Sequence, residues 1–242
     1  MLGAATDLFW WTVKMSGICG IYYLDARPIN EILLGNMLDQ LSHRGPDGAG
    51  LWHSGSARGL DSDSSRGSVG LGHQMLHTTP DSLQEKLPWL HSSGQWVITA
   101  DVRLDNRAAL IDQLGLGAGA VTGLTDSQLI LAAYQQWGDR TPDYLLGDFA
   151  FAIWDQQKQQ LFLARDHFGV KPLYYYCDRH IFAFATEIKA LLVLPEIPQR
   201  LNKVKVADYL ASLFDDKTIT FYEEILRLPP AQSIAVTPEG VK

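Results

Sequence analysis

Histidine, arginine and aspartate occur within five residues of one another in the segment His43-Arg44-Gly45-Pro46-Asp47. These side chains can transfer protons or bind charge, so the segment is the first candidate for chemistry. Glycine and proline make the segment a turn, and an aspartate there can cap its own backbone. We therefore interpret it as a shaped loop that lines a pocket, with Arg44 paired to a carboxylate such as Asp166.

Nucleophilic side chains occur near the start of the chain, where Ser16 and Cys19 lie in the run SGICGIYYL. Because cysteine is among the most buried residue types, we interpret Cys19 as a small core residue of a strand. Cys177, at the end of a second predicted strand, has the same interpretation. Two cysteines are too few for a disulfide framework, which favours a reducing compartment.

Metal and nucleotide chemistry is not indicated. His53, His73, His77 and His91 lack metal-ligand spacing to acidic or cysteine partners, so no metal site is predicted. The glycine-rich residues 115–123 follow a predicted helix instead of a strand, which is the wrong context for a nucleotide loop. We interpret them as a flexible connection.

The composition describes an acidic globular protein. The chain has 242 residues, 46% of them hydrophobic, and a net charge of −7 with a pI near 5.4. This length allows one large domain or two small ones, and the apolar fraction allows a sizeable core. The acidic balance argues against nucleic acid as a partner. No apolar run reaches the about 18 residues of a membrane span, so we expect no membrane insertion and a cytoplasmic location.

Many short strands and interspersed helices position these residues, and this order predicts an α+β layered fold. Asn30 and Thr125 are candidate helix N-caps. Predicted strands cover residues 16–24, 149–155, 161–165, 172–177, 181–186 and 232–236, with others beginning at Val69 and Gln95. Predicted helices cover residues 30–41, 106–114, 125–137 and 204–213, and residues 54–68 are an expected loop.

Five blocks in order resemble the glutamine-hydrolysing domain of the asparagine synthetase family, the class II glutamine amidotransferases. They are residues 16–22, 43–47, 147–155, 164–175 and 184–191. The resemblance covers residues 15–242 and implies a four-layer α/β/β/α sandwich of the N-terminal-nucleophile hydrolase type. Residues 1–14 are predicted to be an extension upstream of a true start at Met15, whose removal would leave Ser16 as the free terminus.

The resemblance also implies a partner. The family joins this domain to a C-terminal ATP-pyrophosphatase synthetase domain, and that domain is absent from this sequence. We expect it to be supplied in cis or in trans, together with its ATP and magnesium, because no Ser-Gly-Gly-x-Asp-Ser type phosphate loop is present here. Glutamine is an expected ligand if the site is active, and a homodimer is a further partner to consider.

In the family, a terminal cysteine attacks the glutamine amide and its own α-amine acts as base. Aligning Ser16 with that cysteine matches every other specified position of the Cys-Gly-Ile-x-Gly-Ile pattern, whereas aligning Cys19 keeps only Cys-Gly-Ile. We prefer the Ser16 register. The family's carboxylate-binding arginine becomes Met75, and a thioether cannot pair with a carboxylate.

The family's Asn-Gly-Glu motif becomes Asp101-Val102-Arg103. The Asn-Gly pair stabilises the oxyanion, and an aspartate carboxylate there would repel it instead. Arg103 falls where the family binds substrate. Asp126 retains the position that binds the glutamine amine, although it is equally typical of a helix start.

Two functions follow. The first is the glutaminase-type domain of an asparagine-synthetase-like amide ligase, with an impaired hydrolysis site in which Ser16 remains a competent nucleophile type. The second is a non-catalytic docking domain of an ATP-dependent ligase of the β-lactam synthetase or lasso-peptide cyclase kind.

Overall fold

The computed structural model describes residues 15–55, 67–117 and 123–242. The predicted extension over residues 1–14 lies outside this part of the chain, as do most of the loop over 54–68 and the middle of the connection over 115–123.

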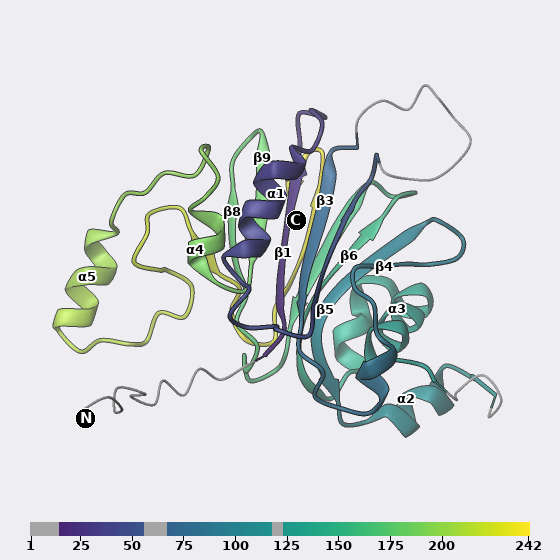
Figure 1. The fold of residues 1–242 in the computed structure, drawn as a ribbon. Helices are drawn as coiled ribbons and strands as arrows, with labels where there is room; N and C mark the ends of the chain where they lie inside the picture. The colour runs from purple at the N-terminus through teal and green to yellow at the C-terminus, as the bar shows by residue number, and fades with distance from the viewer. Residues whose placement is uncertain (1–14, 56–66, 118–122) are drawn as a thin grey trace, which may run out of the picture.

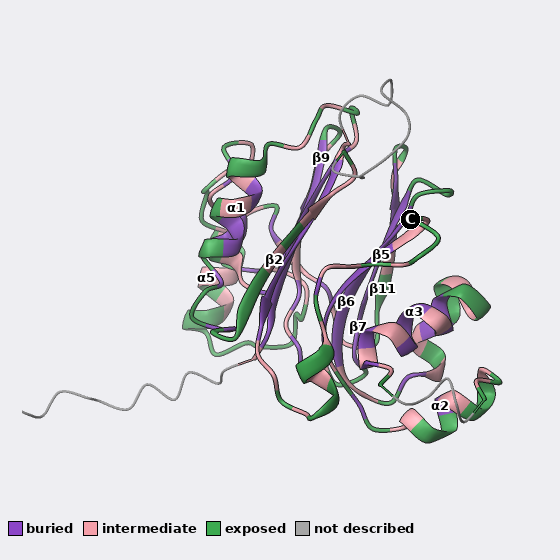
Figure 2. Ribbon diagram, turned by 45° about the vertical axis from the view of Figure 1, so that its right-hand side comes forward, coloured by how far each residue is buried: buried purple, intermediate pink, exposed green. Residues whose placement is uncertain are grey.

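Two antiparallel sheets face each other (Figures 1 and 2). The first contains, in spatial order, β10 (Leu226–Arg227), β8 (Tyr174–Cys177), β9 (Ile181–Ala185), β1 (Gly17–Tyr23), β3 (Val69–Met75) and β2 (Gly48–His53). The second contains β12 (Gly240–Val241), β11 (Ser233–Thr237), β7 (Gln160–Arg165), β6 (Gly147–Asp155), β5 (Trp96–Leu104) and β4 (Trp89–Leu90). We call them the β1 sheet and the β6 sheet.

Helices cover the outer face of each sheet. The β1 sheet is covered by α1 (Glu31–Asp39) and α4 (Ile188–Leu191), and the β6 sheet by α2 (Arg107–Gln113) and α3 (Asp126–Trp137). Short 3-10 helices span Asp81–Gln84 and Gly138–Tyr144. The remaining helix, α5 (Lys203–Leu210), stands apart beyond α4 in Figure 1. The order helix, sheet, sheet, helix is the four-layer sandwich, so the predicted fold class is confirmed.

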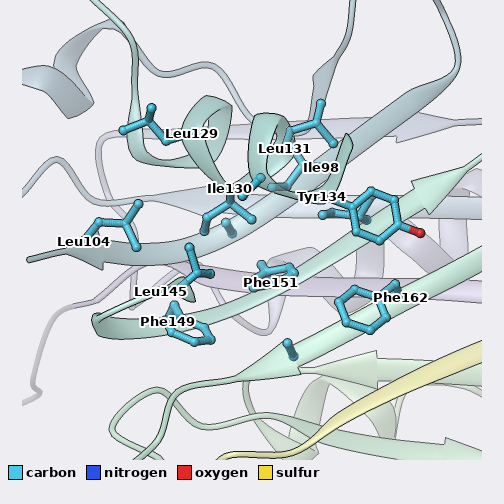
Figure 3. Packing of buried hydrophobic residues seen from close by; sticks show 14 of the residues in the cluster. Ile98, Leu104, Leu129, Ile130, Leu131, Tyr134, Leu145, Phe149, Phe151 and Phe162 are labelled. Atoms are coloured by element: carbon cyan, nitrogen blue, oxygen red, sulfur yellow. The ribbon is translucent and has the colours of Figure 1, made fainter. Parts of the chain in front are cut away.

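The core has three parts, one for each boundary between layers. Figure 3 shows the outer part on the β6 sheet, where Leu129 and Ile130 of α3 pack over Phe151 and Phe162. The matching part under α1 and α4 contains Leu34 and the β1 side chains that point outward. Aromatic and branched side chains fill the space between the sheets: Ile18, Tyr22, Leu71, Trp154, Leu163, Phe182 and Phe184.

Strand β1 is apolar on both faces because each face is buried. Ile18 and Tyr22 point between the sheets, whereas Cys19 and Ile21 point toward α1. Alternate residues of a strand point to opposite faces, so a strand between two packed layers becomes a continuous apolar run. This explains why residues 16–24 predicted a buried strand.

Both predicted helix caps are present. The Asn30 side chain accepts hydrogen bonds from the backbone N–H groups of Ile32 and Leu33 at 3.0 and 3.3 Å. Thr125 and Gln128 form a reciprocal capping box at the start of α3. The capping residues therefore fix the helix that carries Asp126.

The sequence did not predict strand β2. Residues 43–48 carry turn chemistry, and the Gly-Ala-Gly start of β2 has low strand propensity. Pairing with β3 overrides that propensity, with Gly48 opposite Met75 and His53 opposite Gly70. The short strands β4, β10 and β12 and the one-turn helix α4 were also absent from the prediction.

Truncating Leu163 tests whether the space between the sheets is the central core. We expect Leu163→Ala to lower the free energy of unfolding by about 2–5 kcal/mol, because it leaves a cavity at a fully buried position. Leu146→Ala, at a side chain that is 59% exposed, should change it by less than about 0.5 kcal/mol. Chemical denaturation measures both, and equal losses would contradict this assignment of the core.

Candidate active site

Ser16 lies at the entry to β1, beside the end of β3. Its hydroxyl accepts a hydrogen bond from the Leu76 N–H at 3.0 Å and is 3.4 Å from the Leu76 carbonyl. The residue is 6% exposed, so the hydroxyl faces the interior of the site. The Ser16 carbonyl accepts a hydrogen bond from Arg44 Nε at 3.1 Å. Position and contacts therefore place Ser16 within a polar cluster.

Arg44 connects three parts of this cluster. Besides the Ser16 carbonyl, it contacts the Glu187 carboxylate through Nη1 at 2.9 Å and approaches Asp101 Oδ2 through Nη2 at 4.0 Å. The predicted pairing of Arg44 with a carboxylate is correct, but the suggested partner Asp166 is wrong. Asp166 is fully buried and its carboxylate oxygens accept backbone N–H groups of its own loop.

Glu187 lies at the start of α4 and contacts two further basic side chains. His43 Nε2 lies 2.9 Å and Lys189 Nζ 3.3 Å from its carboxylate. Burial opposes ionisation of Glu187, but the hydrogen bonds from Arg44 and His43 outweigh it and lower the pKa of this carboxyl. The predicted turn over residues 43–47 thus positions His43 and Arg44 around a fixed negative charge.

Asp101 is paired with a lysine that the sequence analysis did not single out. Lys171 Nζ lies 2.8 Å from Asp101 Oδ1, and both residues are buried. Asp101 Oδ2 and Arg44 Nη2 have no hydrogen-bond partner among the described residues. Burial raises the pKa of Asp101, against the opposing effect of Lys171 and then of Arg44. Asp101 is therefore a buried, ion-paired carboxyl group at the position where the family resemblance predicts a hydrogen-bond donor.

The loop that carries Lys171 is held by its own first residues. Arg165 donates to the carbonyls of Lys171 and Leu228, both at 2.6 Å, and to that of Gly169. Asp166 accepts the N–H groups of Phe168, Val170 and Lys171 at 3.1, 2.9 and 2.9 Å. Gly169 adopts a φ of +67°, a left-handed conformation that favours glycine. These contacts fix the Lys171 backbone, and they explain the Arg-Asp-x-x-Gly-x-Lys pattern in residues 165–171.

Met75 is buried at the end of β3 and borders a cavity of about 400 Å³. Asp47, His77, Glu85 and the exposed Lys86 are among the other residues that line this cavity. Met75 packs into the core on the β6 sheet, so this position offers the cavity an apolar surface where the resemblance expects a guanidinium.

Glu85 occupies the N-terminus of α3. Its carboxylate accepts the Ser127 N–H at 3.1 Å and also contacts the Ser127 hydroxyl. Burial raises the pKa of Glu85, against hydrogen bonds from the Ser127 backbone and the Thr125 side chain. A helix N-terminus is a favourable place for an anion, and here a side chain of the protein fills it. This backbone site is therefore already occupied by a carboxylate of the protein itself.

Both carboxylate oxygens of Asp126 make contacts that connect elements of the fold. Its Oδ2 accepts the Leu104 N–H at 2.9 Å, and its Oδ1 pairs with Arg107, a residue that the sequence analysis did not identify. The side chain joins β5 to α2 and α3, as a helix-start residue can. Binding of an amine at Asp126 would have to share the carboxylate with Arg107.

Val102 and Arg103 do not join the cluster around Ser16. Val102 packs against the outer core under α3, opposite to Asp101 on the same strand. The Arg103 side chain is 53% exposed and pairs with Asp105 at 3.1 Å and Asp148 at 3.5 Å. Of the predicted set, the structure thus links Ser16 and Asp101 through Arg44, places Met75 next to the Leu76 that contacts Ser16, and leaves Arg103 at the surface.

Cys19 has no access to the site. Its side chain points toward α1, and burial raises the pKa of its thiol to about 12. A thiol that stays protonated is a poor nucleophile.

Burial, with a contribution from His77, lowers the pKa of His73 to about 3, so His73 remains a neutral residue between the sheets.

Among residues 15–55, 67–117 and 123–242, no group of three or more histidine, cysteine and acidic side chains is placed to hold a metal ion. Within the same ranges, no helix has the length and apolar character needed to cross a membrane.

The fold is similar to that of solved structures of one general class of protein. A similar solved structure is the glutamine phosphoribosylpyrophosphate amidotransferase of B. subtilis, with a TM-score of 0.64 and 18% identity over 93% of this chain and 48% of that one. The allosteric regulatory enzyme of purine biosynthesis matches with a TM-score of 0.63. The fold is that of an N-terminal-nucleophile-type amidotransferase.

The family model for the glutamine amidotransferase domain matches residues 15–242, so the chain belongs to this family. Asparagine synthetase [glutamine-hydrolyzing] 3 of Bacillus subtilis is 27% identical over 94% of this chain and 36% of its own length. Putative asparagine synthetase [glutamine-hydrolyzing] 2 of Methanocaldococcus jannaschii is 30% identical over 91% of this chain and 44% of its own length. The chain thus spans less than half of either curated relative, and is an asparagine-synthetase-like glutamine amidotransferase domain.

Removing Lys171 tests whether it neutralises Asp101. We expect Lys171→Met to lower the free energy of unfolding by about 3–5 kcal/mol at neutral pH, because it leaves a buried carboxylate without its nearest cation. Asp101→Asn in the same protein should recover part of this loss. Denaturant titrations of the four proteins in the cycle measure the coupling.

The pH dependence of the stability provides a second test of the pairing between Lys171 and Asp101. The folded pKa of Asp101 lies above its unfolded value, so the folded state binds the proton more tightly and its stability falls as the pH rises through that pKa. Without Lys171 the pKa rises further. The penalty of Lys171→Met should therefore shrink as the pH falls toward the acidic range, and a penalty that does not change with pH would contradict the assignment.

Proposed function

We propose that this chain is the glutaminase-type domain of an ATP-dependent, asparagine-synthetase-like amide ligase, and that its own glutamine hydrolysis is impaired. The observation that carries the proposal is the buried Asp101, ion-paired with Lys171, on the side of the site where an oxyanion would need a donor. The domain then acts as a structural and docking partner for a synthetase half, supplied in cis or in trans.

The family membership supports the general function. The two curated relatives described above are named glutamine-hydrolysing asparagine synthetases, and each is more than twice as long as the region it shares with this chain. A synthetase half that binds ATP and magnesium would lie in the part of those proteins that this chain does not cover. The location of such a ligase in the cytoplasm is part of the same proposal.

The electrostatics of the site support the finer function. An oxyanion that develops near Asp101 meets a carboxyl group instead of an amide N–H, and the loss of one donor typically costs about 100–1000-fold in rate. The substrate carboxylate meets Met75, and Glu85 already fills the N-terminus of α3. These two effects weaken transition-state stabilisation and substrate binding independently.

A domain that does not hydrolyse glutamine releases no ammonia. The amine that forms the amide must then come from the substrate of the ligase. Such a domain would resemble those of β-lactam synthetases and lasso-peptide cyclases, in which an amide forms within one molecule. A working amidotransferase is the second candidate, and it is favoured by one observation: Ser16 stands at the entry to β1 with a buried hydroxyl. An N-terminal serine activated by its own α-amine can be a nucleophile.

Ammonia release from glutamine separates the two functions. The protein is produced from Met15, and mass spectrometry verifies that Ser16 is the terminal residue. We expect no turnover above the Ser16→Ala control. Turnover that Ser16→Ala abolishes would identify Ser16 as a working nucleophile and overturn the proposed impairment.

Restoring the nucleophile alone should not restore hydrolysis. Ser16→Cys supplies the more reactive thiol, but Asp101 and Met75 still oppose the oxyanion and the substrate carboxylate. We expect its ammonia release to stay at the level of Ser16→Ala when the terminus is verified. Hydrolysis by the single variant would show that neither residue limits the reaction.

A further inference from the structure

The segment around α5 exposes apolar side chains, although hydrogen bonds hold both its helix start and its base. The Asn202 side chain caps the helix by accepting the N–H groups of Val204 and Lys205 at 3.1 and 3.2 Å. Backbone hydrogen bonds from Asn202 N to the Phe221 carbonyl and from Arg227 N to the Thr218 carbonyl close the base of the segment. The segment is therefore a fixed projection of the fold.

No residue of α5 is buried. The neighbouring large apolar residues are exposed as well, and we call the group the α5 patch: Leu201, Val204, Tyr209, Leu210, Leu213, Phe214 and Phe221. The ring of Tyr209 contacts the rings of Phe214 and Phe221, each edge to face. A helix of eight residues is marginal by itself in water and is normally stabilised by packing an apolar face.

The patch has the composition of an interface. It contains three aromatic residues joined through Tyr209, and an ion-paired group formed by Arg200, Glu223 and Glu224 lies at its base. Contiguous exposed apolar surface with a polar rim marks a site of protein association. In Figure 1, α5 lies beyond α4, away from the packed layers, and the side chains of the patch are exposed.

The same segment is joined to the candidate active site. On its return to the β6 sheet, the Leu228 carbonyl accepts a hydrogen bond from Arg165 at 2.6 Å, and Ala231 N donates to the Asp166 carbonyl at 2.9 Å. Arg165 and Asp166 are the residues that hold the Lys171 loop. A partner that binds the patch therefore contacts a segment anchored on the loop that carries Lys171, the ion-pair partner of Asp101.

We propose that the α5 patch is the docking surface for the synthetase half of the ligase. Two observations favour this occupant over a second copy of the chain: the curated relatives extend well beyond the shared region, and the patch is tied to the site loop. This inference rests on the proposed partner and not on the proposed loss of hydrolysis, so the ammonia assay can fail without affecting it.

A chimera tests the docking surface. Residues 15–242 replace the matching region of Bacillus subtilis asparagine synthetase 3, and hydrogen exchange is compared with that of the isolated chain. We expect peptides from residues 201–221 to exchange at least about tenfold more slowly in the chimera. Equal rates would overturn the proposal. If the chimera does not fold, the isolated chain is mixed with the separately produced remainder of that relative and the rates are compared in the same way.

Matched variants make the result specific. Leu210→Lys, at a side chain that is 78% exposed, should remove the protection, whereas Ile32→Lys, 75% exposed on α1, should leave it unchanged. Both variants should melt within about 2 °C of the parent when isolated, because neither position is buried. A large loss of melting temperature for Leu210→Lys would show that the patch packs within the domain. Protection in the isolated chain that rises with protein concentration would identify a second copy as the occupant. Either result would contradict the proposal.

Discussion

The ion pair between Asp101 and Lys171 connects the two sheets at the end where the candidate site lies. Asp101 comes from β5 of the β6 sheet, and Lys171 comes from the loop between β7 of that sheet and β8 of the β1 sheet. Arg44 extends the contact to the Ser16 carbonyl at the entry to β1. In a water-poor interior, a charge that loses its partner is costly, so the surrounding backbone has to keep these groups in place.

Other parts of the fold keep these charged groups in place. The core between the sheets sets their separation, and Arg165 and Asp166 fix the loop that delivers Lys171. Glu187, at the start of α4, holds Arg44 from the other side. These contacts hold a set of charged groups next to Ser16, and the carboxyl group of Asp101 is at its centre. Under the proposed function, this arrangement serves as a scaffold in a domain that no longer hydrolyses glutamine.

Sequence patterns predicted the layers better than the contacts. The apolar run at residues 16–24 and the caps at Asn30 and Thr125 are local signals, and each specified its element. Strand β2 could not be predicted, because its glycines become a strand only through pairing with β3. The turn at residues 43–47 indicated that Arg44 would meet a carboxylate, but the choice of Glu187 over Asp166 depends on long-range packing. The same limit applies to two further ion pairs, Lys171 with Asp101 and Arg107 with Asp126. The members of each pair are far apart in the sequence or could have paired with other residues, so only the folded structure shows the pairing.

Titration calorimetry of glutamine into the protein with a verified Ser16 terminus tests the central claim most directly. The claim is that the charges fixed around Asp101, with Met75 and Glu85 in the adjoining cavity, no longer accept the substrate. The account predicts no saturable heat of binding at millimolar glutamine. Saturable binding, weakened by Ser16→Ala or by blocking the cavity with Met75→Trp, would show that the site still recognises glutamine and would contradict the account.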